Sequence, residues 1–353
     1  MKKHYNLLIL FVLIPFLGFS NEDAFISKQK SIKKTYIVNP NAGIDIDNKY
    51  GSISISTWDE DKIDLDIIIK VTGSNENWVN QKLNSIDVDI TALKSMVTAV
   101  TNIGNSTYKS KGSSNSFEIN YIIKIPKNGT VKLNNKYGNI TSSNLESTVD
   151  ISCKYGKINL GKLNGSTSNI QIEYCQNSNI EYIKSGNIEA RYSGLKINEA
   201  GKINLDTNYT DVTILEGQNI KYGCNYGVFK FQKINSFVGS GNYLTISIAE
   251  IFNSLNLDVN YSKVNIGSIN ENANNVSINS GYSDIVLGYD TNYAFDFDIS
   301  TKYSGIKNDG NLQILNSEEK TNSKRISGFY KKKAQNKVVV TSNYGNVSLI
   351  RKQ

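Results

Sequence analysis

Two carboxylates, Glu189 and Asp206, have a spacing that could do chemistry. Each stands three residues before a tyrosine, in consecutive copies of a repeat that runs through this 353-residue chain. If the copies stack as β-strands, the two carboxylates lie about 5 Å apart on one face. That separation suits the acid and the nucleophile of a retaining glycosidase, or a calcium site if further oxygens complete the shell.

The rest of the sequence supports neither kind of site. No third acid follows in that column before Asp258, and the Gly-Gly-x-Gly-x-Asp pattern of calcium-binding solenoids is missing. Like charges on a solvated face explain the same pattern. We therefore predict no catalytic residue, no metal site and no cofactor, and we treat Glu189 and Asp206 only as candidate ligand contacts.

Histidine chemistry is excluded from most of the chain. The single histidine, His4, lies within an N-terminal leader. Ser-His-Asp triads, Cys-His dyads and histidine-ligated zinc therefore have no imidazole after the leader. Together with the isolated carboxylates, this composition predicts a protein that is not an enzyme.

The three cysteines, Cys153, Cys175 and Cys224, are odd in number and unevenly spaced. Secreted disulfide frameworks are denser and paired. Cys153 and Cys224 occupy the same column of the repeat, but four copies and about 19 Å apart, which is beyond the reach of a disulfide. We interpret the cysteines as buried small residues and not as cross-links.

A tyrosine that recurs every 17 to 21 residues defines the repeat. Self-similarity at such a period is the signature of a solenoid. Tyr50 and Tyr344 are separated from the continuous series by insertions. The continuous series is Tyr137, Tyr155, Tyr174, Tyr192, Tyr209, Tyr226, Tyr243, Tyr261, Tyr282 and Tyr303.

Each position around the tyrosine keeps a constant character. The residue three places later is apolar in every copy except at Asn177, and the residue four places earlier is apolar or aromatic except at Gly239. Alternation within each run predicts strands. Glycine, serine or threonine directly follows the tyrosine in all but two copies, which predicts a corner. No proline occurs after Pro126, as continuous strand pairing requires.

These patterns predict an all-β, single-chain β-solenoid with coils of 17 to 21 residues. A right-handed β-helix is expected, because parallel crossovers are nearly always right-handed. Residues 58–129 do not repeat and predict a small α+β insertion, with a helix near residues 76–86, after the first coil. The expected divisions are a signal peptide at 1–20, an N-terminal segment and first coil at 21–57, the insertion at 58–129, the solenoid repeats at 130–307, and a basic excursion with closing strands at 308–353. Within the last division, residues 338–349 are expected to close the C-terminal end of the stack.

The direction of the tyrosine rings decides between two interpretations. The tyrosines share their parity with apolar columns two and four residues earlier, so simple alternation predicts that the rings point inward. If the rings face outward instead, they form an aromatic strip that could stack on sugar faces. On that second interpretation, Tyr192, Tyr209 and Tyr226 are candidate ligand contacts.

The leader predicts export. Lys2 and Lys3 precede an apolar run at 7–19, and Gly18 and Ser20 form a small-residue cleavage site, as in a secretory signal peptide. No later apolar run is long enough to span a membrane. We expect the periplasm or the cell surface of a Gram-negative bacterium, or secretion, with no transmembrane span after cleavage.

The C-terminal segment is basic. From Lys320 to Gln353 there are nine basic residues and no acidic one. A solvated loop explains this run, and contact with an anionic surface through Lys331, Lys332 and Lys333 is the alternative. The interleaved aromatic and basic residues of nucleic-acid-binding proteins are absent, so no nucleic-acid partner is expected.

The run Asn-Lys-Tyr-Gly-Ser-Ile-Ser-Ile at 48–55 recurs in similar form at 135–140 and 343–349. With the leader and the interrupted first coil, the chain resembles a family of exported bacterial β-strand-repeat proteins of unknown function, many of them from Bacteroidetes, that are usually labelled putative adhesins. The resemblance covers nearly the whole chain after the leader. It implies a stacked β fold and a place in the cell envelope. The family has no established catalytic residues, so none is carried over.

Three hypotheses about function follow. The first is a non-enzymatic envelope protein, an adhesin or surface-presentation scaffold whose solenoid binds a glycan or an envelope or matrix protein. The second is a β-helical polysaccharide lyase or hydrolase that uses carboxylates, although such enzymes have longer coils and loops that build a cleft. The third is a periplasmic sensing or scaffold component that acts through the insertion.

Overall fold

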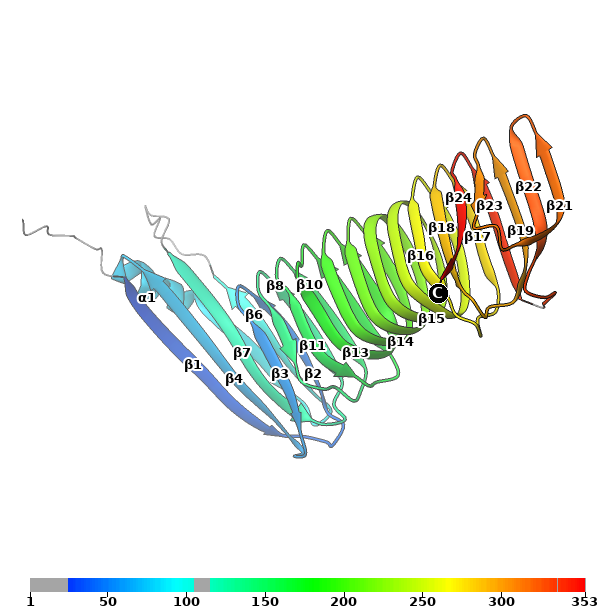
Figure 1. The fold of residues 1–353 in the computed structure, drawn as a ribbon. Coiled ribbons are helices and arrows are strands. Elements are labelled where there is room, and N and C mark those ends of the chain that lie inside the picture. The colour runs from blue at the N-terminus through cyan, green and yellow to red at the C-terminus, as the bar shows by residue number, and fades with distance from the viewer. Residues whose placement is uncertain (1–24, 105–114, 335, 353) are drawn as a thin grey trace, which may run out of the picture.

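The protein is an elongated stack of β-coils with a covered end on each side (Figure 1). The computed structural model describes residues 25–104, 115–334 and 336–352. The expected signal peptide lies outside the described residues. The predicted all-β solenoid is confirmed, with one helix, α1 (Glu76–Ser85), among the described residues.

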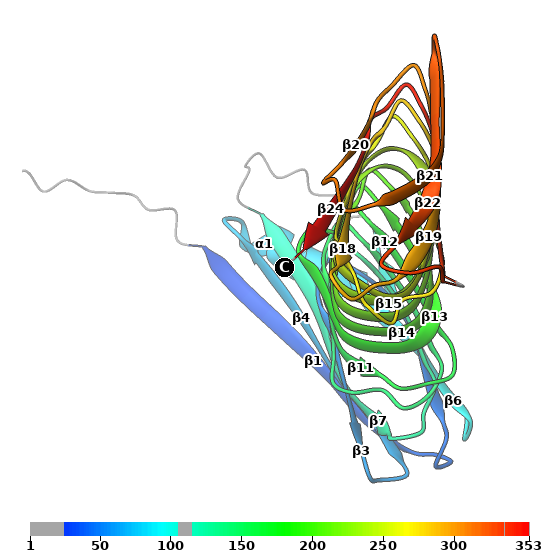
Figure 2. The same ribbon diagram turned by 45° about the vertical axis from the view of Figure 1, so that its right-hand side comes forward.

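Each coil has two strands that meet at its tyrosine, and these strands form two faces (Figure 2). The pre-tyrosine face contains β2 (Gly43–Lys49), β8 (Val131–Lys136), β10 (Val149–Lys154), β12 (Ser168–Glu173), the later parts of β13 (Ser178–Arg191) and β14 (Gly194–Asn208), parts of β15 (Asp211–Asn260), and then β17 (Val276–Gly281), β23 (Lys337–Asn343) and β19 (Phe295–Lys302). The post-tyrosine face contains β3 (Ile53–Trp58), β9 (Ile140–Ser142), β11 (Ile158–Leu163), the earlier parts of β13 and β14, parts of β15, and then β16 (Lys263–Ile269), β18 (Asp284–Asp290), β24 (Val347–Lys352) and β20 (Ile306–Asn308).

The core lies between these two faces. Equivalent residues of successive coils pair in parallel register, so that Ile151 lies opposite Leu133 on one side and Ile170 on the other. The same column continues through Ile188 to Leu205. All five side chains are buried. The apolar columns of the sequence therefore become continuous ridges, which no single coil could bury alone.

The insertion builds the N-terminal end of the stack. Two of its strands, β6 (Met96–Ile103) and β7 (Ser116–Pro126), add parallel to β2 and β3 and so form one more layer. Antiparallel strands then cover this layer: β5 (Ile86–Ala92) on β6, β4 (Lys62–Gly73) on β7, and β1 (Ile26–Ile37) on β4. Helix α1 contacts β4 and β1, and the side chain of Asn75 caps it by accepting from the N–H of Trp78 at 3.0 Å.

The C-terminal end differs from the sequence prediction. Residues 338–349 do not close the stack, because β23 inserts between β17 and β19, and β24 inserts between β18 and β20. The end is covered by an antiparallel hairpin of β21 (Gln313–Lys320) and β22 (Ser323–Tyr330), which pairs with β19. The spacing of 21 residues between Tyr282 and Tyr303 gives no sign of this insertion, since it continues the period of the repeat.

Candidate ligand-binding surface

The twelve repeat tyrosines all adopt a left-handed backbone, with φ between 48° and 62°. This conformation breaks the simple alternation of a strand, because the Cα–Cβ bond rotates away from the direction that an extended residue would give it. The prediction that the rings point inward is therefore wrong. The inward position at the corner belongs to the next residue instead, as shown by the buried Ser193 and Thr210.

The rings form a continuous outward row, which we call the tyrosine ladder. Each ring is between 41% and 52% exposed. Neighbouring rings stack with centroids 4.7–5.1 Å apart and interplanar angles of 1–18°. In spatial order the ladder is Tyr50, Tyr137, Tyr155, Tyr174, Tyr192, Tyr209, Tyr226, Tyr243, Tyr261, Tyr282, Tyr344 and Tyr303.

The ladder combines unfavourable and favourable contributions to stability. A left-handed backbone costs a non-glycine residue about 1–2 kcal/mol. A stacked aromatic pair contributes about 0.5–1.5 kcal/mol beyond the area it buries. The half-buried rings also remove apolar area from water, so their stacking offsets the backbone cost while one edge of each ring stays open to solvent.

The residue after each tyrosine holds the corner closed. In some copies its hydroxyl joins two coils: the N–H of Cys175 donates to Ser193 Oγ at 3.0 Å, and the N–H of Ser193 donates to Thr210 Oγ1 at 3.2 Å. In others the residue is glycine, and the coils touch directly. A Cβ on Gly138 would lie 1.7 Å from the carbonyl oxygen of Gly51. The tyrosine ladder therefore lies on closely packed corners.

The polar side chains beside the ladder change along its length. Near its ends, lysine ammonium groups lie over tyrosine rings, with Lys136 4.9 Å from the centroid of Tyr137 and Lys302 5.4 Å from that of Tyr303. In the middle, neutral amides take the same position. Asn242 Nδ2 donates to Asn225 Oδ1 at 2.9 Å, and the row extends through Asn208 and Asn260. The column directly before the tyrosines is therefore uncharged from Asn208 to Asn260.

A hollow lies beside this central part of the ladder. Small residues, Gly223 and Ser240, occupy the outward column that Asp206 and Asp258 occupy on either side. No atom outside the neighbouring residues lies within 4 Å of a Cβ built on Gly223. The hollow combines a polar floor with the asparagine row at its rim. The sequence carries its signal, two small residues between two acids in one column, but we did not predict the hollow.

The candidate carboxylates lie opposite each other on neighbouring coils, as predicted, but only one of them has an ion-pair partner among the described residues. Glu189 and Asp206 are opposite residues of β13 and β14, and both are exposed. Asp206 accepts from Arg191 Nη1 at 3.0 Å, so its charge is already paired. Within the described parts of the chain, no group of three or more histidine, cysteine or acidic side chains could hold a metal ion. Tyr192 and Tyr209 stand at the ends of the same strands.

The lysine cluster lies away from the ladder. Tyr330, next to Lys331, pairs with Phe295 at the start of β19, whereas the ladder lies at the other end of that strand. Lys331 Nζ donates to Asn292 Oδ1 at 2.9 Å, and Lys332 and Lys333 are exposed. The three lysines and the tyrosines therefore cannot form one contiguous site.

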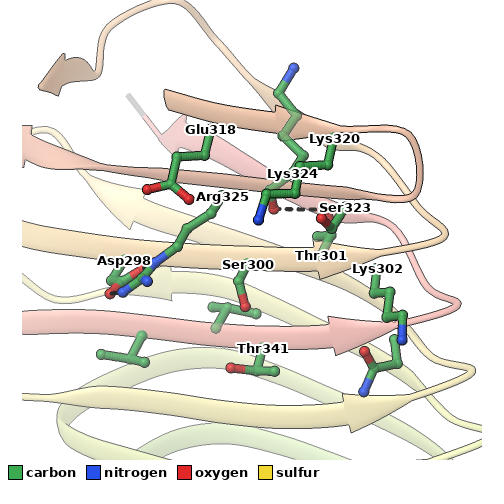
Figure 3. A pocket seen from close by; sticks show the side chains of 13 residues that line it. Asp298, Ser300, Thr301, Lys302, Glu318, Lys320, Ser323, Lys324, Arg325 and Thr341 are labelled. Carbon is green, nitrogen blue, oxygen red and sulfur yellow. Dashed lines mark hydrogen bonds and ion pairs between the residues drawn. The ribbon is translucent and has the colours of Figure 1, made fainter. Parts of the chain in front are cut away.

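A pocket lined by β19, β23 and the C-terminal hairpin is also charged, and some of its charges are paired (Figure 3). Arg325 binds Asp298 with two hydrogen bonds of 2.9 and 2.6 Å, and these bonds hold the pKa of Asp298 below its usual value. Lys324 pairs with Glu319 at 3.1 Å. The first pair fastens β22 onto β19, and the second joins β22 to β21.

The chain matches no family model and no curated protein at a significant level. Among solved structures it is similar to a putative cell adhesion protein from Clostridium sporogenes ATCC 15579, with 13% identity over 92% of this chain and 100% of that chain and a TM-score of 0.19. It is also similar to putative adhesins from Parabacteroides distasonis ATCC 8503 (11% identity, 91% of this chain and 97% of that chain, TM-score 0.34) and Parabacteroides merdae ATCC 43184 (10%, 91% and 96%, TM-score 0.31).

These structural neighbours carry the same adhesin designation as the family that the sequence resembles. Their identities and TM-scores are too low for any residue or ligand to be carried over, so the site rests on the geometry of this chain. No helix in the described residues is long and apolar enough to cross a membrane.

Proposed function

We propose that this protein is an exported, non-enzymatic protein of the cell envelope that binds an extended glycan along the tyrosine ladder. The observation that carries the proposal is the ladder itself, a row of stacked and half-exposed rings held on strained backbone. Neighbouring rings cover the faces of each inner ring, so a ligand along the ladder meets a continuous row of ring edges. A glycan can lay its apolar C–H groups along these edges and offer its hydroxyls to the polar neighbours.

The surroundings of the ladder favour a neutral polymer. A ligand with repeating units matches binding groups that repeat with each coil, and an open face accommodates a chain that extends at both ends. Nucleic acid requires a basic stripe along its phosphates. The centre of the ladder is flanked by Asn208, Asn225, Asn242 and Asn260 instead, which suits sugar hydroxyls. The hollow at Gly223 and Ser240 adds room for a substituent on the polymer.

The carboxylates give the test against an enzyme. We expect Glu189→Gln to leave glycan binding within about twofold of wild type, because Glu189 lies on the solvated outer face and Asp206 is paired with Arg191. Binding is measured by co-sedimentation and depolymerisation by reducing-end release, both on a panel of polysaccharides and with Lys196→Gln as the matched surface control. A depolymerising activity that Glu189→Gln abolishes while the protein stays folded would replace this proposal with a β-helical glycosidase or lyase.

Export is tested in cells. We expect a C-terminally tagged chain to lose its leader and to be digested by added protease in intact cells, because an adhesin must face outward. Cells whose outer membrane has been opened, and a cytoplasmic marker, are the controls. Protection until the outer membrane is opened would place the protein in the periplasm and favour a scaffold role acting through residues 58–129. An uncleaved, protected chain in both samples would contradict export.

A further inference from the structure

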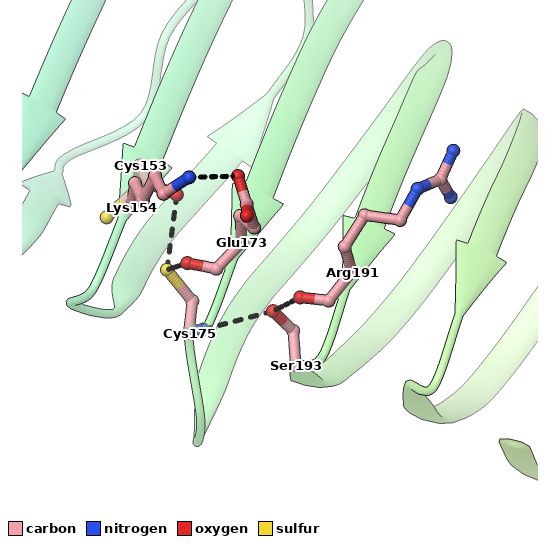
Figure 4. A network of polar contacts seen from close by, with 6 residues as sticks. All are labelled: Cys153, Lys154, Glu173, Cys175, Arg191 and Ser193. Carbon is pink, nitrogen blue, oxygen red and sulfur yellow. Dashed lines mark hydrogen bonds and ion pairs between the residues drawn. The ribbon is translucent and has the colours of Figure 1, made fainter.

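Two of the three cysteines, Cys153 and Cys175, lie on neighbouring coils and contact each other's surroundings (Figure 4). Cys153 lies in β10, two residues before Tyr155, and Cys175 directly follows Tyr174 in the next coil. The strands of these coils pair in register, with Cys153 opposite Ile172. Both cysteine side chains are buried, with exposed fractions of 1% and 0%.

The left-handed corner brings these residues together although they occupy different columns of the repeat. After each such tyrosine, the chain turns the next side chain back beneath the preceding coil. Thr210 Oγ1, for example, donates to the carbonyl oxygen of Ala190 at 3.2 Å. Cys175 Sγ takes the equivalent position and donates to the carbonyl oxygen of Cys153 at 3.2 Å and to that of Glu173 at 3.3 Å.

The two thiols also interact with each other. A hydrogen bond from the Cys153 thiol lowers the pKa of Cys175 to about 7, although burial acts in the opposite direction. The same contact, together with burial, raises the pKa of Cys153. Cys153 Sγ additionally lies 3.5 Å from the carbonyl oxygen of Gly138. The sulfur atoms therefore share one closed space between two coils.

We propose that Cys153 and Cys175 form a disulfide that joins these neighbouring coils when the protein folds in an oxidising compartment. The contact of Cys175 Sγ with the backbone carbonyl of Cys153 places the second thiol beside the first residue, on strands that already pair in register. The cross-link goes beyond the proposed function, because it concerns how two coils beneath the tyrosine ladder are joined and not what the ladder binds.

The hydrogen bonds at the corner do not require a thiol at the position of Cys175. Ser193 and Thr210 make the same corner contacts with hydroxyl groups. In the described coils, Cys175 is the one cysteine that follows a repeat tyrosine, and the coil before it offers a second cysteine. Cys224 stands in the same column as Cys153, but the corresponding residue of the next coil is Leu244, so Cys224 has no sulfur partner there.

The reaction is thiol–disulfide exchange with an oxidised dithiol, such as a protein disulfide or glutathione disulfide. Cys175, as its thiolate, attacks one sulfur of the oxidant, forming a mixed disulfide and releasing one thiolate. Cys153 then attacks Cys175 Sγ, forms the Cys153–Cys175 bond and releases the second thiolate. The two protons from the cysteines go to the released thiolates, so the oxidant is reduced and the chain loses two hydrogens. Because both thiols are buried, the exchange takes place before the coils close.

The test is intact-mass analysis after alkylation in denaturant. The full chain is exported into the periplasm of an expression host, and a second sample is refolded in a glutathione redox buffer. We expect one alkylated thiol, Cys224, and a linked pair of peptides containing Cys153 and Cys175. Reduction in denaturant before alkylation should raise the count to three. The oxidised protein should melt at a higher temperature than the reduced protein.

Variants separate this pairing from the alternatives. Cys224→Ser is the matched control and should leave the cross-link intact with no alkylated thiol. Cys153→Ser with Cys175→Ser should remove the effect of reductant on the melting temperature. Three alkylated thiols in the protein refolded with glutathione, or a cross-link that includes Cys224, would overturn the proposal. Because the refolded sample does not pass through a cell, this result is independent of whether the chain is exported or binds glycan.

Discussion

Replacing Tyr192, Tyr209 and Tyr226 together by asparagine is expected to weaken glycan binding by ~10–1,000-fold. The three rings are consecutive in the ladder, and each would contribute about 0.5–1.5 kcal/mol through contact of its exposed edge with the ligand. Asparagine is chosen because it tolerates the left-handed backbone better than other side chains do, so the corner is kept while the ring is removed. Binding is measured by co-sedimentation with insoluble polysaccharides and by titration with soluble ones.

Two control variants show which part of the tyrosine matters. The triple replacement by phenylalanine keeps the rings and removes the hydroxyls, so we expect it to retain most of the affinity. Asparagine at Tyr50, the first ring of the ladder, should have a small effect because it leaves the central rings in place. A triple asparagine variant that stays folded and binds as wild type does would show that the ladder is only structural.

The second large effect concerns the corner beneath the ladder. We expect Gly138→Ala to destabilise the protein by about 3 kcal/mol or more, because the new methyl group would lie 1.7 Å from the carbonyl oxygen of Gly51 in the neighbouring coil. That oxygen belongs to the backbone and cannot move without separating two coils. The measurement is chemical unfolding followed by circular dichroism, with hydrogen exchange to locate the loosened coils.

Gly223→Ala is the matched control for this prediction. A Cβ at Gly223 would meet nothing within 4 Å, so we expect unchanged stability or a gain of about 0.4–1 kcal/mol from the less flexible unfolded chain. The methyl group would enter the hollow, so this variant also reports whether the hollow contacts ligand. Equal stability of Gly138→Ala and wild type would show that the coils are spaced more widely than the structure has them.

The stacked fold could be predicted because its signals are local and repeated. Apolar columns at fixed offsets from the tyrosine, such as the one through Ile151 and Ile170, specify strands, register and core together. The order of the last coils could not be predicted in this way. Placing β23 between β17 and β19 is a choice between two similar pairings of the same columns, and nothing local in residues 338–349 distinguishes them.

The candidate site was harder to predict than the fold, because one backbone angle decides it. Alternation assigns Tyr192 to the core only if its φ is negative, whereas a φ of 50° turns the ring to solvent. The left-handed backbone of Tyr174 likewise brings Cys175 beneath Cys153, which a comparison of residues within one column of the repeat could not show. The small residue after each tyrosine predicts a corner, and the structure has one there. The pattern does not show that the tyrosine itself takes the left-handed backbone that turns its ring outward.

Affinity as a function of glycan length tests the central claim most directly. The wild-type chain is titrated with size-fractionated oligosaccharides of a polysaccharide that it co-sediments with. If the ladder is an extended binding surface, affinity should rise with each added sugar until the oligosaccharide spans several rings, and the triple asparagine variant should lose that rise. Equal affinity for a monosaccharide and a long oligosaccharide, or the absence of binding to every polysaccharide by the folded protein, would contradict the account.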